Sequence, residues 1–141
     1  MKISAKTDYA CRALLELALH WPPKEPLQIQ EIARNQKIPV KFLTHILVQL
    51  KQSGYVESSR GQKGGYVLIK APKDIRLGDV IRDFSNIEFI PKKKNKSNQG
   101  QVLSEIWVES EIVFWDYLSK ITFEHIRTRQ SNLKTVPMYA I

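Results

Sequence analysis

The chain has 141 residues, which allows one domain with a substantial core and is too short for two enzyme domains. Its 22 Lys and Arg residues against 14 Asp and Glu give a net charge of +8, which favours a polyanionic partner such as nucleic acid or an anionic membrane. The single cysteine, Cys11, excludes an intramolecular disulfide and a metal site of several cysteines. Because neither a long apolar run nor a signal-peptide pattern is present, we expect a cytoplasmic protein with no membrane partner.

The first predicted element is an amphipathic helix. Ser4 or Thr7 can cap its start, apolar residues follow at helical spacing, and the helix must end before Pro22 and Pro23. Apolar residues at positions 29, 32 and 33 then mark a second, short helix. We therefore expect two helices joined by a proline-containing turn in the first 36 residues.

A third helix and a hairpin are predicted next. Proline suits the first turn of a helix, so Pro39 marks its start, and Gly54 stands where the left-handed residue after a helix belongs. The apolar face of this helix is expected in the core and comprises Phe42, Leu43, Ile46, Leu47 and Leu50. Two short β-prone runs, at residues 55–56 and 66–69, flank a loop rich in glycine, which predicts a long hairpin.

The second half is predicted to be helical. Helical spacing appears over residues 77–84, from Leu103 to about Lys120 and over 123–130. Charge separates the halves, since residues 37–70 hold six basic side chains and one acid, whereas 97–119 hold four acids and no base. Different partners are therefore expected for the two halves.

Two short helices followed by a glycine-rich, basic hairpin are typical of a winged helix-turn-helix. The second helix of such a pair can enter the major groove of DNA, while the wing holds phosphates. Lys41, Thr44 and His45 lie near the start of that helix and are the candidates for base contacts. Arg60 is the candidate for insertion into a groove, because a guanidinium can bond a guanine edge or fit a narrow minor groove, and Lys63 is expected to meet phosphate.

Several segments carry a family signature. They are Met1 to Ser4, Glu31 to Ala33, Ile38 to Leu43, Leu50 to Val56 and the hairpin motif Arg60-Gly61-Gln62-Lys63-Gly64-Gly65-Tyr66. With them the chain resembles the IscR-like family of bacterial transcription regulators, which includes CymR-type and NsrR-type repressors. The resemblance implies a homodimeric repressor whose two winged domains read a pseudo-palindromic operator in double-stranded DNA.

The resemblance also implies a set of DNA-binding residues. They are Pro39, Lys41, Thr44, His45, Arg60, Gly61, Lys63, Gly64, Gly65 and Tyr66. Thr44 and His45 differ from the Glu-Gln pair that some members place there, so we do not expect this chain to share their operator sequence.

The long helix near the C-terminus is apolar on more than one face, which indicates that it buries against its own domain and against a second subunit. The residues expected at the dimer contact are Leu103, Ile106, Trp107, Ser110, Val113, Phe114, Tyr117 and Leu118. A purely intrachain core is the alternative interpretation.

These inferences define the expected organisation. The fold is mainly α with a small β-hairpin wing. We expect a winged helix-turn-helix domain over residues 1–85, a basic loop over 86–100, a dimerisation helix and an exit helix over 101–131, and a tail over 132–141.

Many members of the resembled family bind an iron-sulfur cluster through three cysteines in the loop before the dimer helix. The basic loop replaces that cysteine loop and holds no cysteine, so we expect no cofactor. Asp8 resembles a carboxylate ligand found in part of the family, but a carboxylate is also favoured in the first turn of any helix. Cys11 is either a redox sensor or an inert packed thiol.

Other functions are weighed against DNA-binding regulation. The winged domain could instead be an interaction module that binds a metabolic-enzyme partner and holds DNA weakly. No nucleophile-base pair or phosphate loop is present, so an enzyme is not expected. The effector, a small molecule or a protein, is not identified by any motif.

Overall fold

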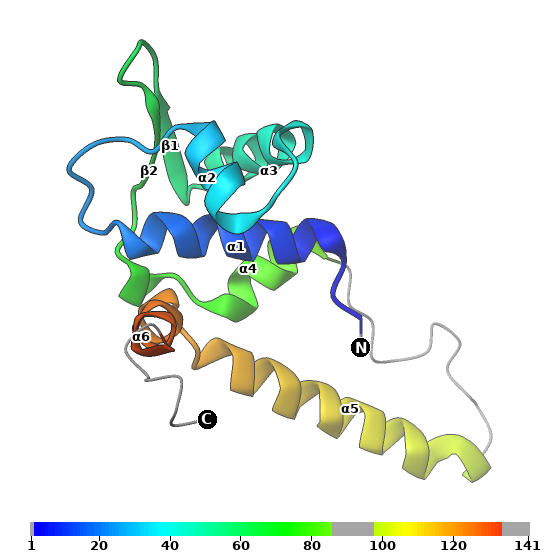
Figure 1. Ribbon diagram of the computed structural model, residues 1–141. Coiled ribbons are helices and arrows are strands. Elements are labelled where there is room, and N and C mark those ends of the chain that lie inside the picture. Colours follow the sequence, from blue (N-terminus) through cyan, green and yellow to red (C-terminus); the bar gives the residue numbers. More distant parts are fainter. Residues whose placement is uncertain (1, 86–97, 134–141) are drawn as a thin grey trace, which may run out of the picture.

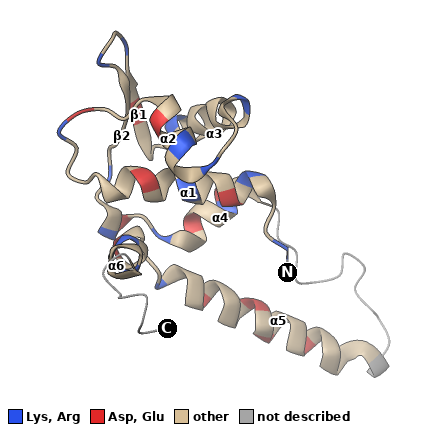
Figure 2. Cartoon of the chain, in the orientation of Figure 1, with Lys and Arg blue, Asp and Glu red and all other residues tan. Residues whose placement is uncertain are grey.

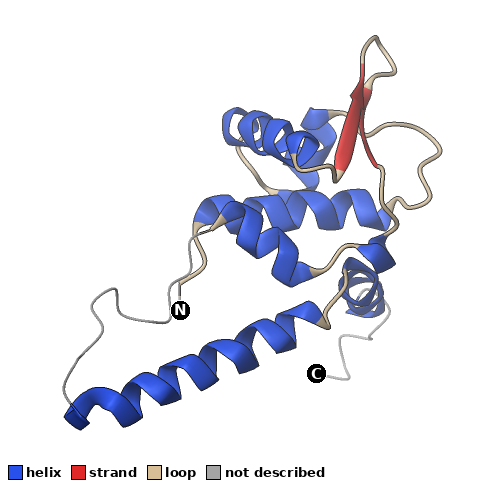
Figure 3. Cartoon of the chain, turned by 180° about the vertical axis from the view of Figure 1, so that it is seen from behind, coloured by secondary structure: helices blue, strands red, loops and turns tan. Residues whose placement is uncertain are grey.

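The computed structural model describes residues 2–85 and 98–133. Its elements are α1 (Ala5–Leu19), α2 (Ile29–Gln36), α3 (Val40–Gln52), β1 (Val56–Ser59), β2 (Gly65–Leu68), the short 3-10 helix η1 (Pro72–Asp74), α4 (Leu77–Phe84), α5 (Asn98–Ser119) and α6 (Phe123–Leu133). In Figure 1, α1 lies at the centre, with α2, α3 and the hairpin on one side and α4 and α6 on the other. α5 extends as a long arm, also seen from behind in Figure 3.

The predicted ends of the first helices are confirmed. Ser4 precedes α1, and its Oγ accepts a hydrogen bond from the backbone N–H of Thr7 at 3.2 Å. The Thr7 side chain is fully buried and donates to the Phe84 carbonyl, which joins α1 to the end of α4. Gly54 has φ of 83°, the left-handed conformation expected after α3.

The hydrophobic core surrounds α1. Four of the five apolar residues predicted for the core face of α3 are buried, namely Leu43, Ile46, Leu47 and Leu50. The prediction for Phe42 is wrong, because its side chain is 48% exposed and stacks beside Tyr9 of α1 with ring centroids 6.4 Å apart. Phe42 lies at the edge of the apolar face, where α1 covers only one side of the ring.

α6 and η1 connect α5 to the winged domain. The Leu77 N–H donates to the Ile121 carbonyl at 2.8 Å, and the Phe123 N–H donates to the Ile75 carbonyl at 2.9 Å. Phe123 is 1% exposed and belongs to the same core as α1. Arg127 of α6 donates to carbonyl oxygens at the end of α1, so α6 is bound to the scaffold of the winged domain.

α4 covers the predicted residues 77–84, whereas α5 and α6 are both longer than predicted. α5 begins at Asn98 rather than near 103, so the end of the predicted basic loop is helical, and α6 continues to Leu133. The rest of that loop, 86–97, and the tail from 134 lie outside the described residues. Among the helices within the described ranges, none combines the length and the apolar character needed to cross a membrane.

Candidate nucleic-acid interface

α2 and α3 form a helix pair with a tight turn. Lys37 adopts a left-handed conformation with φ of 53°, Ile38 turns into the core at 3% exposure, and Pro39 precedes the first turn of α3. The buried face of α3 fixes which side chains point outward. Because a helix advances about 100° per residue, the direction opposite that face is occupied by Lys41, His45, Val48 and Gln52.

The outward face of α3 is available for contact. Lys41 and His45 are exposed, and Val48 is 48% exposed. The Thr44 hydroxyl donates to the Val40 carbonyl at 2.9 Å, which leaves its oxygen as an acceptor. The start of α3 therefore offers a cation, an imidazole and a hydroxyl oxygen, the groups that bind base edges.

The hairpin places two basic residues at its tip. β1 and β2 are antiparallel, with Val56 opposite Leu68 and Ser59 opposite Gly65. Arg60 is exposed, and so is Lys63, and neither forms an ion pair within the part of the chain that the structure describes. Figure 2 shows that basic residues mark the tip of the hairpin, which projects from the same side of α1 as α3.

Glycine is required in the loop by its geometry. Gly61 has φ of 105°, and the Gly64 N–H donates to the Gly61 carbonyl at 2.9 Å. A Cβ at Gly64 would overlap the Ser59 carbonyl oxygen. Larger residues at these positions would therefore open the loop and move Arg60.

The wing is bound to the segment that precedes α2. The Leu27 N–H donates to the Tyr66 carbonyl at 2.9 Å, and the Tyr66 N–H donates to the Leu27 carbonyl at 2.8 Å. Gln28 Nε2 also donates to the Gln62 carbonyl at 3.0 Å. Between the start of α2 and the hairpin lies a groove of about 500 Å³, lined mainly by polar side chains and backbone. The hairpin is thus held in a defined position beside the helix pair.

The DNA-binding residues predicted from the sequence divide into two groups. Those with exposed side chains or backbone are Pro39, Lys41, Thr44, His45, Arg60, Gly61 and Lys63, whereas Gly64 is buried and Gly65 and Tyr66 are half-buried. The second group shapes the wing.

Val48 and Gln52 share the outward face with Lys41 and were not among the predicted residues, although their spacing of seven and eleven residues from Lys41 is the signal that identifies them.

α5 carries a large exposed apolar surface. Six of the residues predicted for dimer contact are exposed, namely Leu103, Ile106, Trp107, Ser110, Val113 and Tyr117, and Phe114 is half-buried. Leu118 is 8% exposed and packs on α4, where a Cβ added to Gly78 would lie 3.3 Å from Leu118 Cβ. Val102, Val108 and Ile112 are exposed apolar residues that the predicted set lacks.

Neither sensor candidate has the chemistry of a reactive site. Asp8 forms an ion pair with Arg12 at 3.0 Å. Burial, and to a lesser degree the charge of Asp8, raises the pKa of the Cys11 thiol to about 12. Cys11 is therefore protonated at neutral pH, and a thiol reacts and binds metal as the thiolate.

The donor set does not fit an iron-sulfur cluster held by cysteines. The whole sequence contains one cysteine. Within residues 2–85 and 98–133, no three His, Cys, Asp or Glu side chains are grouped so that they could hold a metal ion. His125 is used structurally, since its Nδ1 accepts from the Thr122 N–H at the start of α6.

Comparison with known proteins gives consistent matches. The family model Rrf2, described as an iron-dependent transcriptional regulator, matches residues 3–129. The rrf2-like HTH-type transcriptional regulator of Rhodobacter capsulatus is 45% identical over 82 residues, which cover 57% of this chain and 55% of that protein. The HTH-type transcriptional regulator NsrR of Bacillus subtilis is 32% identical over 145 residues, 98% of this chain and 99% of that protein. The solved structure of T. potens IscR has a TM-score of 0.80 at 27% identity and covers 99% of this chain and 96% of that one.

Proposed function

The chain belongs to the Rrf2 family of DNA-binding transcriptional regulators, and we propose that it is a homodimeric repressor that reads a pseudo-palindromic operator with α3 and the hairpin. The observation that carries the proposal is the common orientation of two basic elements. The outward face of α3 and the tip of the hairpin both extend from one side of α1, and the contacts between Leu27 and Tyr66 hold the hairpin there.

Each element has a distinct role in this proposal. Lys41, Thr44 and His45 read base edges in the major groove from the start of α3. Arg60 enters the groove beside α3, where its guanidinium bonds a guanine edge bidentately, and Lys63 neutralises a phosphate. Gly64 maintains the loop that carries both basic residues.

α5 supplies the dimer interface. Val102, Ile112, Val113 and Tyr117 are each 64–68% exposed, and so much exposed apolar surface on one helix favours association. A twofold axis through paired α5 helices would present two copies of α3 to one face of DNA. Two half-sites about 34 Å apart, one turn of the duplex, would then be read together.

We propose that the protein senses its signal without a cysteine-ligated iron-sulfur cluster. One cysteine cannot supply three ligands, and the Asp8 carboxylate is already paired with Arg12. We expect protein purified without oxygen to be colourless and free of stoichiometric iron. Visible absorption together with bound iron would contradict this part of the proposal.

The main test is selection of operator sequences. Full-length protein is incubated with a pool of random DNA duplexes, bound duplexes are sequenced after several rounds, and the mass of the complex is measured by sedimentation. We expect an enriched inverted repeat and two chains per duplex. Recovery of duplexes without sequence enrichment would overturn sequence-specific regulation, and one chain per enriched site would overturn the dimer.

A further inference from the structure

A cavity lies between the winged domain and α6. It has a volume of about 650 Å³, within the range of small-molecule sites. Its polar lining comes from Glu16 of α1, from His20 just after α1, from Asn35 and Gln36 of α2, and from Gln130 and Ser131 of α6, and Leu15 and Leu19 of α1 add apolar surface. The lining is predominantly polar, so a polar ligand suits it better than an apolar one.

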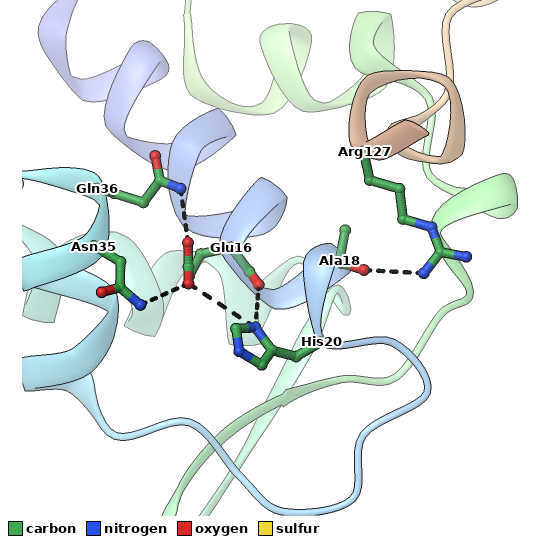
Figure 4. A network of polar contacts seen from close by, with 6 residues as sticks. All are labelled: Glu16, Ala18, His20, Asn35, Gln36 and Arg127. Carbon is green, nitrogen blue, oxygen red and sulfur yellow. Dashed lines mark hydrogen bonds and ion pairs between the residues drawn. The ribbon is translucent and has the colours of Figure 1, made fainter. Parts of the chain in front are cut away.

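The centre of this cavity wall is a buried carboxylate. Glu16 is 4% exposed, and its oxygens accept hydrogen bonds from Asn35 Nδ2 and Gln36 Nε2, both at 2.8 Å, as Figure 4 shows. Two oxygens offer about four acceptor positions, so capacity remains for further donors. The amide donors satisfy part of that capacity but do not neutralise the charge.

No permanent cation neutralises Glu16 within the described residues. Its only ion-pair contact there is His20 Nδ1 at 3.9 Å, and that nitrogen lies closer, at 3.0 Å, to the Glu16 carbonyl oxygen. Arg12 is committed elsewhere, because its guanidinium bonds the Gln36 carbonyl and pairs with Asp8. A buried charge without a counter-ion is unfavourable, so a ligand cation would gain strongly from binding beside it.

The helices around the cavity add to its negative potential. Asn35 and Gln36 are the last two residues of α2, and His20 follows the last residue of α1. The carboxyl ends of helices carry partial negative charge and favour cations. Neither Lys nor Arg is among the described lining residues, so the cavity is a locally anionic site in a chain of net charge +8.

We infer that this cavity binds a small organic cation, an amine or a guanidine, whose charged group pairs with Glu16. A guanidinium can donate two parallel hydrogen bonds to a carboxylate, and an ammonium can donate to Glu16 and to the side-chain oxygens of Asn35 and Gln36.

The position of the cavity couples the ligand to DNA binding, a consequence that rests on the proposed function. Its walls come from α1, from α2 of the helix pair and from α6, whose Arg127 bonds the Ala18 carbonyl at 3.2 Å. A ligand that bridges these walls changes the orientation of α2 and α3 relative to α6 and α5. The ligand then changes the affinity of the protein for its operator. Because such coupling is reciprocal, the operator changes the affinity for the ligand by the same factor.

The test measures ligand binding without DNA. Agmatine, which carries an amine and a guanidine, is titrated into the full-length protein by isothermal calorimetry, with glutarate as an anionic probe. We expect one saturable agmatine site per chain and no heat from glutarate. In E16Q the affinity should fall about tenfold or more, as when one member of a buried charge pair is removed. D74N is the matched control, because Asp74 is exposed and lies outside the cavity lining, and it should bind as the wild type does.

Two results would overturn the inference: absence of agmatine binding at millimolar concentration, or equal affinities of the wild type and folded E16Q. If E16Q unfolds by circular dichroism, S131W replaces it, since Ser131 is exposed and a tryptophan there fills the mouth of the cavity. We expect S131W to lose agmatine binding, and unchanged binding by it would contradict the site.

Operator affinity is then measured by fluorescence anisotropy with and without agmatine. We expect agmatine to change the affinity of the wild type and not that of E16Q. Retained agmatine binding in a protein that selects no operator would sink the proposed function and leave the cavity site standing. A protein that selects its operator and does not bind agmatine would refute the cavity site alone.

Discussion

A Cβ on any residue other than glycine at position 65 would overlap the Leu27 carbonyl oxygen. The two residues are 38 positions apart, yet the hydrogen bonds between Leu27 and Tyr66 bring their backbones together. The second glycine of the pair at 64–65 is therefore a packing requirement. It fixes the wing against the segment that leads into α2.

A methyl group at position 65 is expected to move the wing. G65A must push the Leu27 backbone away, and overpacking of this kind costs about 1–3 kcal/mol. We expect a lower melting temperature by circular dichroism and weaker operator binding by anisotropy. S59A is the matched control, because Ser59 faces Gly65 across the hairpin and already has a Cβ. Equal stability of G65A and S59A would show that the Leu27 contact does not restrict this position.

Arg60 is expected to supply sequence discrimination. R60A removes a guanidinium that has no ion pair within the described residues, so the fold should be unchanged. Loss of a bidentate base contact weakens specific binding by roughly 1 to 3 kcal/mol. The measurement is anisotropy with the selected operator and with a scrambled duplex. R60A should lose affinity for the operator and retain its affinity for the scrambled duplex.

Lys63 provides the matched control for Arg60. It lies three residues further along the same loop and carries the same charge, but its proposed contact is a phosphate. K63A should weaken binding to both duplexes equally and reduce the slope of log affinity against log salt by roughly 1. If R60A and K63A have the same profile, Arg60 is also a phosphate contact.

α5 is expected to determine the oligomeric state. Val113 is 68% exposed in the middle of the helix, so V113E should fold and place a charge in the dimer contact. We expect dimer dissociation to become easier by about tenfold or more, measured by sedimentation equilibrium, because a charge in the apolar centre of an interface must lose its hydration. I69E introduces the same charge at an exposed apolar residue outside α5 and should remain dimeric. A dimeric V113E would place the interface elsewhere.

The sequence predicts local structure well wherever the cause is local. Helical spacing, the Ser4 cap and the glycine at 54 determine α1 and α3 within the chain itself. The exposure of Phe42 could not be predicted, because it depends on how far α1 reaches over the edge of α3. The cavity at Glu16 was equally hidden, since its amide partners are 19 and 20 residues away and are brought there by helix packing.

Cys11 is expected to be unreactive in the folded protein. Since burial raises its pKa to about 12, almost none of the thiol is ionised at pH 7.5, whereas the unfolded thiol has an ordinary pKa of 9.0. Alkylation by iodoacetamide should therefore be slower in buffer than in urea by about a hundredfold or more. The same shift makes the folded state less stable as pH rises from about 9 toward 12, because over that range only the unfolded thiol ionises.

C11A should bind operator equally before and after peroxide treatment, as should the wild type. A wild-type protein that loses operator binding after peroxide, while C11A does not, would show that Cys11 is a redox sensor.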